Sequence, residues 1–203
     1  MFPHWQDVLD AFAYVPPDTT NENYYNGPYY KLLCTTFHPS LLEHSGYIIC
    51  PFYPLTEDDP ATERATFVVV TMQWQPLFVL QLHPPGHINL LSTRIAADSK
   101  MRATFRSLCP ETVTPKLHGV SAMGQRLAFY SMDTSSGRVL PDYVPTAGDG
   151  TEMDTVPENR WEFDITTEAG HQQFMKVVND VKNMDRNRES WHAWLNKVLC
   201  TTQ

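Results

Sequence analysis

The feature that most constrains the fold is the order of five predicted elements in the middle of the chain. Two apolar runs without a charged residue have the length of strands, and such runs are typical of strands that are buried on both faces. A helical segment and two more strand-like runs follow. In chain order these elements are strands 66–72 and 77–82, helix 93–108, and strands 116–123 and 126–133. This order predicts an α/β fold with a central mixed sheet.

The flanking segments complete a prediction of one domain over residues 1–203. Residues 1–45 form a helical region, 46–133 the α/β core, 134–160 a long loop and 161–203 the C-terminal helices. Inside these regions we expect helices at 3–13, 28–37, 167–184 and 188–199, and a further strand at 46–52. Ser92 or Thr93 is the expected N-cap of helix 93–108, and Thr167 that of helix 167–184.

The length and composition are those of an intracellular globular protein. A chain of 203 residues buries roughly 70% of its surface on folding. No apolar run approaches the roughly 20 residues that span a bilayer, and the first residues do not form a secretory signal. Four widely spaced cysteines never form a CxxC pair, so we expect free, buried thiols in a reducing compartment. The expected compartment is the cytoplasm or the nucleus, without membrane association.

Charge is unevenly distributed along the chain. The net charge is −8, but residues 94–138 hold seven basic and three acidic residues. On the predicted helix, Arg94, Asp98, Arg102 and Arg106 recur every four residues and share one face. That face is either a strip that contacts phosphate or an acidic partner, or a solvated ladder of ion pairs. Candidate binding residues are Arg94, Arg102, Arg106 and Arg126.

Several segments carry a resemblance to a known family. They read GPYYKLL at 27–33, PLFVLQLHPP at 76–85, STRIAADSKMR at 92–102, LHGVSAMG at 117–124 and WEFDI at 161–165. Together they resemble a group of proteins from mushroom-forming fungi that look like distant members of the PD-(D/E)XK, or restriction-endonuclease-like, superfamily. The resemblance covers roughly three quarters of the chain and implies a restriction-endonuclease-like core.

The resemblance implies a metal-dependent site and also its loss. Active superfamily members hold one or two Mg²⁺ ions with an aspartate and a glutamate from adjacent strands. A lysine two residues after the glutamate assists the attacking water. In the fungal group the strand usually ends in Glu-x-Lys-Pro, whereas here Gln81 and His83 stand at the glutamate and lysine positions. No cofactor is therefore expected, except Mg²⁺ if nuclease chemistry survives.

Replacements for the missing charges remain open. Glu63 could stand in for the aspartate, Lys100 for the lysine, and Gln81 could be a weakened ligand. His83 and His87 could take part in a zinc site only with ligands from elsewhere in the fold, because two prolines between them forbid an α-helix. The simpler interpretation of these two histidines is a rigid loop at the end of a buried strand.

Two aromatic groups also allow alternatives. The tyrosines at 24, 25, 29 and 30 could stack bases or sugars, or lie half in the core and half at its rim. Trp191 and Trp194 on the last predicted helix could pack on the domain, form a homodimer contact or bind another partner.

Three functional hypotheses follow. The first is a catalytically degenerate nuclease-fold protein that binds a macromolecular partner, either protein or nucleic acid. The second is a divergent Mg²⁺-dependent nuclease that cleaves DNA or RNA. The third is a protein that binds a small molecule in the old cleft between Gln81, His83 and the helix. NTP- and dinucleotide-binding glycine motifs are absent from the sequence.

Overall fold

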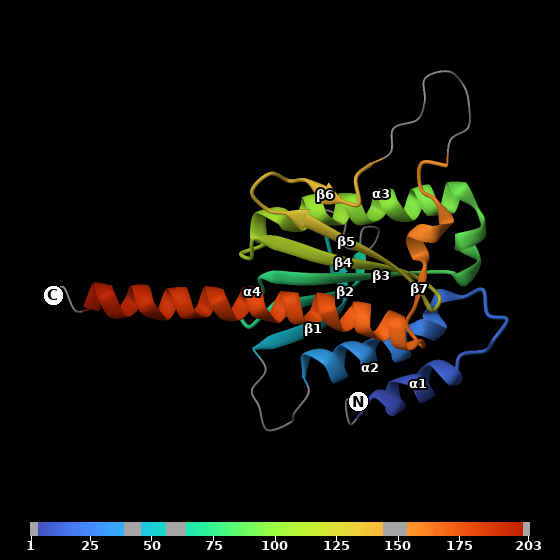
Figure 1. Cartoon of the computed structure of the whole chain (residues 1–203), viewed down its shortest axis with the longest axis horizontal. Coiled ribbons are helices and arrows are strands. Elements are labelled where there is room, and N and C mark those ends of the chain that lie inside the picture. The colour runs from blue at the N-terminus through green and yellow to red at the C-terminus, as the bar shows by residue number, and fades with distance from the viewer. Residues whose placement is uncertain (1–3, 39–45, 56–63, 144–153, 201–203) are drawn as a thin grey trace, which may run out of the picture.

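The computed structural model describes residues 4–38, 46–55, 64–143 and 154–200. Four α-helices and seven strands make up this part of the chain (Figure 1). The helices are α1 Trp5–Ala13, α2 Asn26–Phe37, α3 Leu91–Leu108 and α4 Glu168–Cys200. The strands are β1 Tyr47–Pro54, β2 Arg64–Thr71, β3 Pro76–His83, β4 Lys116–Met123, β5 Arg126–Asp133, β6 Val139–Leu140 and β7 Phe163–Asp164.

The strands form one mixed sheet in the order β1-β2-β3-β4-β5-β6, with β7 paired to β5. β1, β2 and β3 form an antiparallel meander, β4 runs parallel to β3, and β5 returns antiparallel to β4. α3 makes the crossover between the two parallel strands, as such a connection requires. The predicted α/β fold with a central mixed sheet flanked by helices is confirmed.

The helices cover the sheet unequally. α3 lies on one face, and α1, α2 and α4 lie on the other (Figure 1). Along β3, Phe78, Leu80 and Leu82 belong to the core under α1, α2 and α4. Val79 points the opposite way, into the core under α3. All eight residues of β3 are buried, which is what its apolar sequence predicts for a central strand.

α4 corrects the prediction of two C-terminal helices. It is continuous over 33 residues, because the segment between the two predicted helices holds neither proline nor glycine. There Arg188 Nη2 donates to Asp185 Oδ1 at 3.0 Å, one helical turn earlier. At the other end the predicted cap is confirmed, since the Gly170 N–H donates to Thr167 Oγ1 at 3.2 Å.

The start of α3 also differs from the prediction. The helix begins at Leu91, so neither Ser92 nor Thr93 is its N-cap. Thr93 Oγ1 instead donates back to the carbonyls of His87 and Leu90, at 2.5 and 2.8 Å. Residues 134–160 are likewise more structured than a long loop, because they include β6 and the first residues of a 3-10 helix, Glu158–Trp161.

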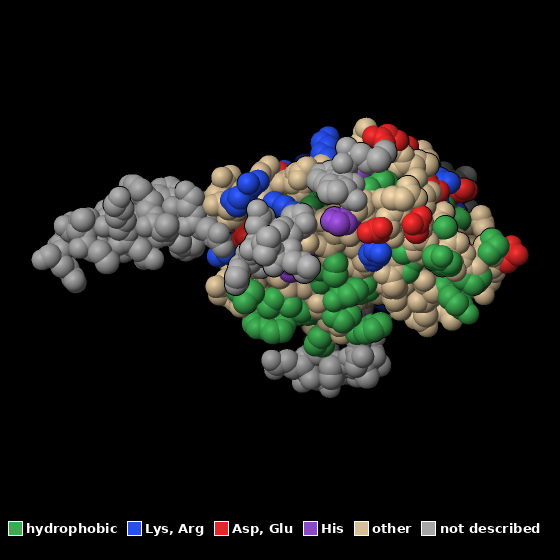
Figure 2. Space-filling view, turned by 90° about the horizontal axis from the view of Figure 1, so that it is seen from below, with side chains coloured by type: hydrophobic (Ala, Val, Ile, Leu, Met, Phe, Trp, Pro, Cys, Tyr) green, Lys and Arg blue, Asp and Glu red, His purple; other side chains and the backbone are tan. Residues whose placement is uncertain are grey.

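The side of the molecule that carries α1, α2 and β1 is drawn in Figure 2, where apolar side chains gather in the lower part of the view. The tyrosine cluster contributes to both core and rim, as one of its two interpretations predicts. Tyr25 and Tyr29 are buried, whereas Tyr24 and Tyr30 are exposed. Tyr29 donates its hydroxyl to the Gly124 carbonyl at 2.7 Å, at the turn between β4 and β5.

The cysteines and the helices bear on the expected thiol state and on the expected lack of membrane association. Cys34, Cys50 and Cys109 are free, as their spacing predicts, but each is partly exposed and not buried as expected. Among the described helices none is both long and apolar enough to cross a membrane.

Candidate functional site

The predicted site lies where β3 and β4 end side by side under α3. The parallel register pairs Gln81 with Ser121 and His83 with Met123. α3 approaches the sheet closely because Gly119 on β4 has no side chain. A Cβ there would lie 2.7 Å from Met101 Sδ on α3. Gln81 and His83, two positions apart on β3, therefore lie beneath a tightly packed helix.

Gln81 is completely buried and held by α3. Its Nε2 donates to Thr104 Oγ1 at 2.5 Å. Its Oε1 has no hydrogen-bond partner within the described residues, and the same holds for the Ser121 hydroxyl. Buried polar atoms without a partner are uncommon and call for an explanation. Here they mark a polar position that has become enclosed by apolar packing.

His83 is neutral at physiological pH. Its ring is 9% exposed, and this burial, together with the nearby charges of Lys100 and His87, lowers its pKa to about 3. Lys100 itself is exposed on α3. The sequence prediction that Lys100 lies beside the site is therefore consistent with the structure, but its charge acts against a proton on His83.

These donors do not fit the Mg²⁺ that the resemblance implies. Mg²⁺ takes hard, mostly anionic oxygen ligands in octahedral geometry, and this position offers a neutral amide oxygen, a hydroxyl and a neutral imidazole. Glu63, the expected substitute for the aspartate, lies outside the described residues. Within those residues, no three His, Cys, Asp or Glu side chains are grouped to hold a metal ion.

The segment after β3 is a short 3-10 helix, Pro85–Asn89. Two prolines exclude an α-helix there, but Pro85 occupies the first turn, where its missing N–H costs nothing. His83 thus ends β3, and His87 lies inside the 3-10 helix that follows.

Arg94 is not a surface contact residue, which corrects the predicted binding strip. It is buried, and each of its three side-chain nitrogens donates to a partner within the protein. Nε donates to the Val156 carbonyl, Nη1 to the Ile88 carbonyl and Nη2 to Asp154 Oδ2, each at 2.8 Å. The guanidinium group fastens the segment that begins at Asp154 to the start of α3.

Asp98 is the centre of a second buried group. It is 2% exposed and accepts hydrogen bonds from Arg102 Nε at 2.7 Å, from Tyr130 Oη at 3.1 Å and from Arg160 Nη1. Arg102 Nη2 also donates to the Pro141 carbonyl at 2.5 Å. Arg102 is therefore committed as well. The i,i+4 pair of Asp98 and Arg102 is present but largely buried, so it is not part of a solvated ladder, and neither Arg94 nor Arg102 belongs to a contact strip. Of the predicted binding residues, Arg106 and Arg126 are exposed, and Arg126 Nε donates to the Trp161 carbonyl at 2.8 Å.

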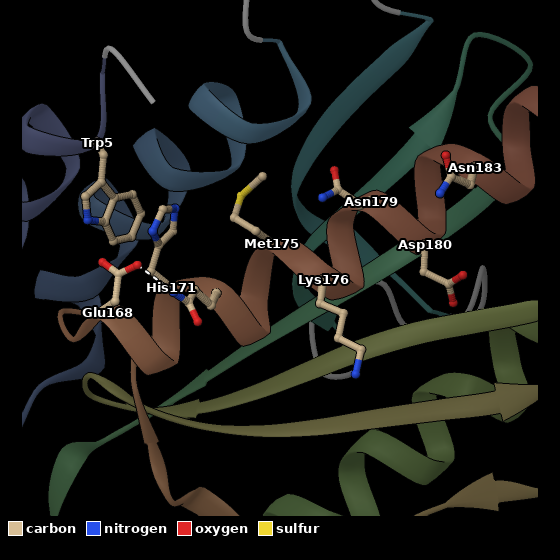
Figure 3. Close-up of a pocket in the computed structure, with 9 residues that line it drawn as sticks. Trp5, Glu168, His171, Met175, Lys176, Asn179, Asp180 and Asn183 are labelled. Carbon is tan, nitrogen blue, oxygen red and sulfur yellow. Dashed lines mark hydrogen bonds between the residues drawn. The ribbon is translucent and has the colours of Figure 1, made fainter. Parts of the chain in front are cut away.

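Two hollows lie on the opposite face of the sheet, along α4. The first, which we name the α4 groove, has a volume of about 830 Å³. Figure 3 shows Trp5 of α1 beside His171 of α4 at one end of this groove, and polar side chains of α4 along its length. The two rings stack with centroids 3.6 Å apart, so this end of the groove is rigid.

The second hollow, the β4–β5 pocket, lies between α4 and strands β4 and β5. Its volume is about 620 Å³. His118 on β4 and Asp180 on α4 line it, and His118 Nε2 lies 2.8 Å from Asp180 Oδ2. The sequence analysis missed this pair. Sixty-two positions separate the two residues, and no local pattern connects them.

We predict that Asp98→Asn strongly destabilises the protein. The change leaves two buried guanidinium groups short of a counter-charge, which costs about 3–5 kcal/mol when one partner of a buried ion pair is removed. Urea unfolding measures the loss. Asp142→Asn is the matched control, because Asp142 forms an exposed pair with Arg138 and its loss should leave the unfolding midpoint unchanged. Equal, small effects of both changes would contradict a supporting role for Asp98.

The lowered pKa of His83 predicts a pH-dependent stability. The unfolded chain takes up a proton on this ring near pH 6.5 and the folded chain only near pH 3. Stability is therefore intact above about pH 6.5 and falls by up to about 1.4 kcal/mol per pH unit as pH decreases through this window. As pH falls, the unfolding free energy of wild type should decrease relative to that of His83→Gln. Its difference from the unfolding free energy of Ser121→Ala should stay constant. Unfolding free energies measured between pH 7 and 4.5 provide the comparison, and a constant difference from His83→Gln would contradict the prediction.

No protein-family model and no curated protein matches this sequence. A solved structure similar to it is that of the type IIG restriction endonuclease BpuSI, with a TM-score of 0.41 and 14% sequence identity. The alignment covers 78% of this chain but 17% of the endonuclease chain. The chain thus spans less than a fifth of the length of that endonuclease.

Proposed function

We propose that this chain is a restriction-endonuclease-like protein that has lost metal-dependent catalysis and acts by binding a macromolecular partner. The observation that supports this most is the state of the β3 terminus. Gln81 is bonded to Thr104 of α3, and His83 is kept neutral by burial. The position where the superfamily gathers charge holds neutral, enclosed groups instead.

Hydrolysis of a phosphodiester needs a cation near the leaving and attacking oxygens, together with access for water and substrate. A ring with a pKa of about 3 carries no positive charge at neutral pH, so His83 does not replace a lysine. Gln81 would have to break its bond to Thr104 and expose a completely buried amide to meet a substrate. Both requirements weigh against the divergent-nuclease hypothesis.

The charges favour a protein partner over a nucleic acid. Binding to phosphates needs uncommitted cations, and the guanidinium groups of Arg94 and Arg102 are used inside the fold. The net charge of the chain is −8. A general affinity for DNA or RNA is not expected from this distribution.

α4 provides the element for a protein contact. A helix of 33 residues is about 50 Å long, whereas strands of eight residues span about 27 Å. Its C-terminal part therefore extends past the sheet (Figure 1). A helical segment without tertiary packing is marginal in water. Its apolar sequence positions 191, 194, 195 and 198 fall on one side by the helical repeat, and we propose a second copy of the chain as its partner.

A nuclease assay tests the loss of catalysis. We expect no cleavage of plasmid, single-stranded DNA or RNA with Mg²⁺ or Mn²⁺, and no rise in melting temperature on adding either ion. If wild type does cleave, Gln81→Leu identifies the source, with Gln172→Leu on the exposed side of α4 as its control. Metal-dependent cleavage that Gln81→Leu abolishes and Gln172→Leu retains would refute the proposal.

Sedimentation of the full chain tests the partner. We expect a concentration-dependent dimer that becomes monomeric when Trp191 and Trp194 are both changed to Glu. Trp74→Glu is the control, because Trp74 is another large side chain, 59% exposed, at the turn between β2 and β3. A wild type that stays monomeric at about 10⁻⁴ M would exclude the second copy as the partner. So would a dimer that only Trp74→Glu dissociates.

A further inference from the structure

The β4–β5 pocket has the size and lining of a small-molecule site. Its volume of about 620 Å³ lies within the range of roughly 300–1,000 Å³ that ligand pockets occupy. Its floor holds Phe129 of β5 and Phe163 of β7, whose rings meet edge to face with centroids 5.6 Å apart. Leu140 and Pro141 form the wall at the sheet edge. The lining is therefore mostly apolar and aromatic.

The pocket remains open because α4 covers the sheet only in part. Phe174, Val177, Val178 and Val181 bury the helix against the middle of the sheet. Phe129 and Phe163, farther toward the β5 side, pack only partly against that core. Both rings stay half-buried. An aromatic surface that the protein's own helix leaves half covered is available to another planar group.

One buried polar side chain lines this apolar pocket. His118 is 8% exposed, and its Nε2 lies 2.8 Å from Asp180 Oδ2. Burial lowers the pKa of His118 more than Asp180 raises it, so the ring is neutral at pH 7. A neutral imidazole beside a carboxylate donates through the nitrogen that faces it. Nδ1 is then left as a hydrogen-bond acceptor.

The charged residues of the pocket do not select a charged ligand. Lys176 and Asp180 lie on the same helix at its mouth, and Glu162 lies on the far side. Arg160 also lines the pocket, but its Nη1 is bonded to Asp98. Ser131, Asn159 and Gln173 are the uncharged polar residues that also line the pocket. His118 differs from them because it is buried beside the two phenyl rings.

We propose that the β4–β5 pocket binds a planar, uncharged aromatic molecule that carries one hydroxyl group. Its ring system lies against Phe129 and Phe163, and its hydroxyl donates to His118 Nδ1. This site is independent of the partner-binding function, and it lies on the other face of the sheet from Gln81 and His83. A ligand there neither requires nor restores nuclease chemistry.

The test uses 2-naphthol as the probe and naphthalene as the same ring system without the hydroxyl. Both are titrated into the full-length chain and followed by probe fluorescence. We expect 2-naphthol to bind more tightly than naphthalene by about fivefold to tenfold, the contribution of one neutral hydrogen bond. His118→Leu should remove this difference while leaving naphthalene binding in place.

Phe163→Ala provides a variant whose folding is less at risk, because this residue lies half-buried in a strand of two residues. It should weaken both probes by about tenfold. Met175→Ala, which alters the α4 groove, is the matched control and should change neither affinity. No binding of 2-naphthol up to its solubility limit would overturn the proposal. So would equal binding of the two probes to wild type, or a loss that follows Met175→Ala in place of Phe163→Ala.

Discussion

The contacts between α3 and the strands at the β5–β6 side of the sheet depend on the buried carboxylate of Asp98. Burying a charge is costly unless it is paired and hydrogen-bonded, and here two guanidinium groups and a tyrosine hydroxyl meet that requirement. The donors come from α3, β5 and the 3-10 helix Glu158–Trp161. Through Arg102 the cluster also reaches the Pro141 carbonyl after β6. A single anion thus holds the last strands of the sheet to the crossover helix.

That cluster also helps to position the C-terminal segment that follows Arg160. Arg160 leads directly into Trp161, β7 and the start of α4. Gly170, in the first turn of α4, passes so close to β7 that a Cβ there would lie 1.8 Å from the Asp164 carbonyl oxygen. α4 is therefore aligned by one ion cluster and one close backbone approach. Its angle leaves Phe129 and Phe163 half covered, which is the origin of the β4–β5 pocket.

The central strands were predictable because their pattern is local. β4 and β5 agree with the predicted bounds at both ends, since apolar runs on either side of Gly124 define them, and Gly124 adopts the left-handed conformation (φ +60°) that such a turn needs. The neutrality of Gln81 and His83 also follows from residue type and strand burial. The contact with Thr104 does not, because it joins β3 to α3 across 23 positions.

The arginines of α3 were misinterpreted for the same reason. A repeat of four places Arg94, Asp98 and Arg102 on one helical face, and the rules for a helix surface then apply only if that face is solvated. It is not, because Asp154 and Arg160, 60 and 62 positions away, fold back onto it. Sequence spacing reports which residues share a face but not what covers that face.

The two faces of the sheet are packed differently. Under α3, Gly119 permits a close approach, and the result is a compact layer in which even polar atoms are enclosed. Under α4 the packing is tight along the middle of the sheet, where Phe174, Val178 and Val181 are buried, and hollows remain on either side of the helix. A site that must admit a ligand needs the second kind of packing. A fold that encloses the side chains of Gln81 and Ser121 on one face and keeps open, aromatic surface on the other has its accessible polar groups along α4.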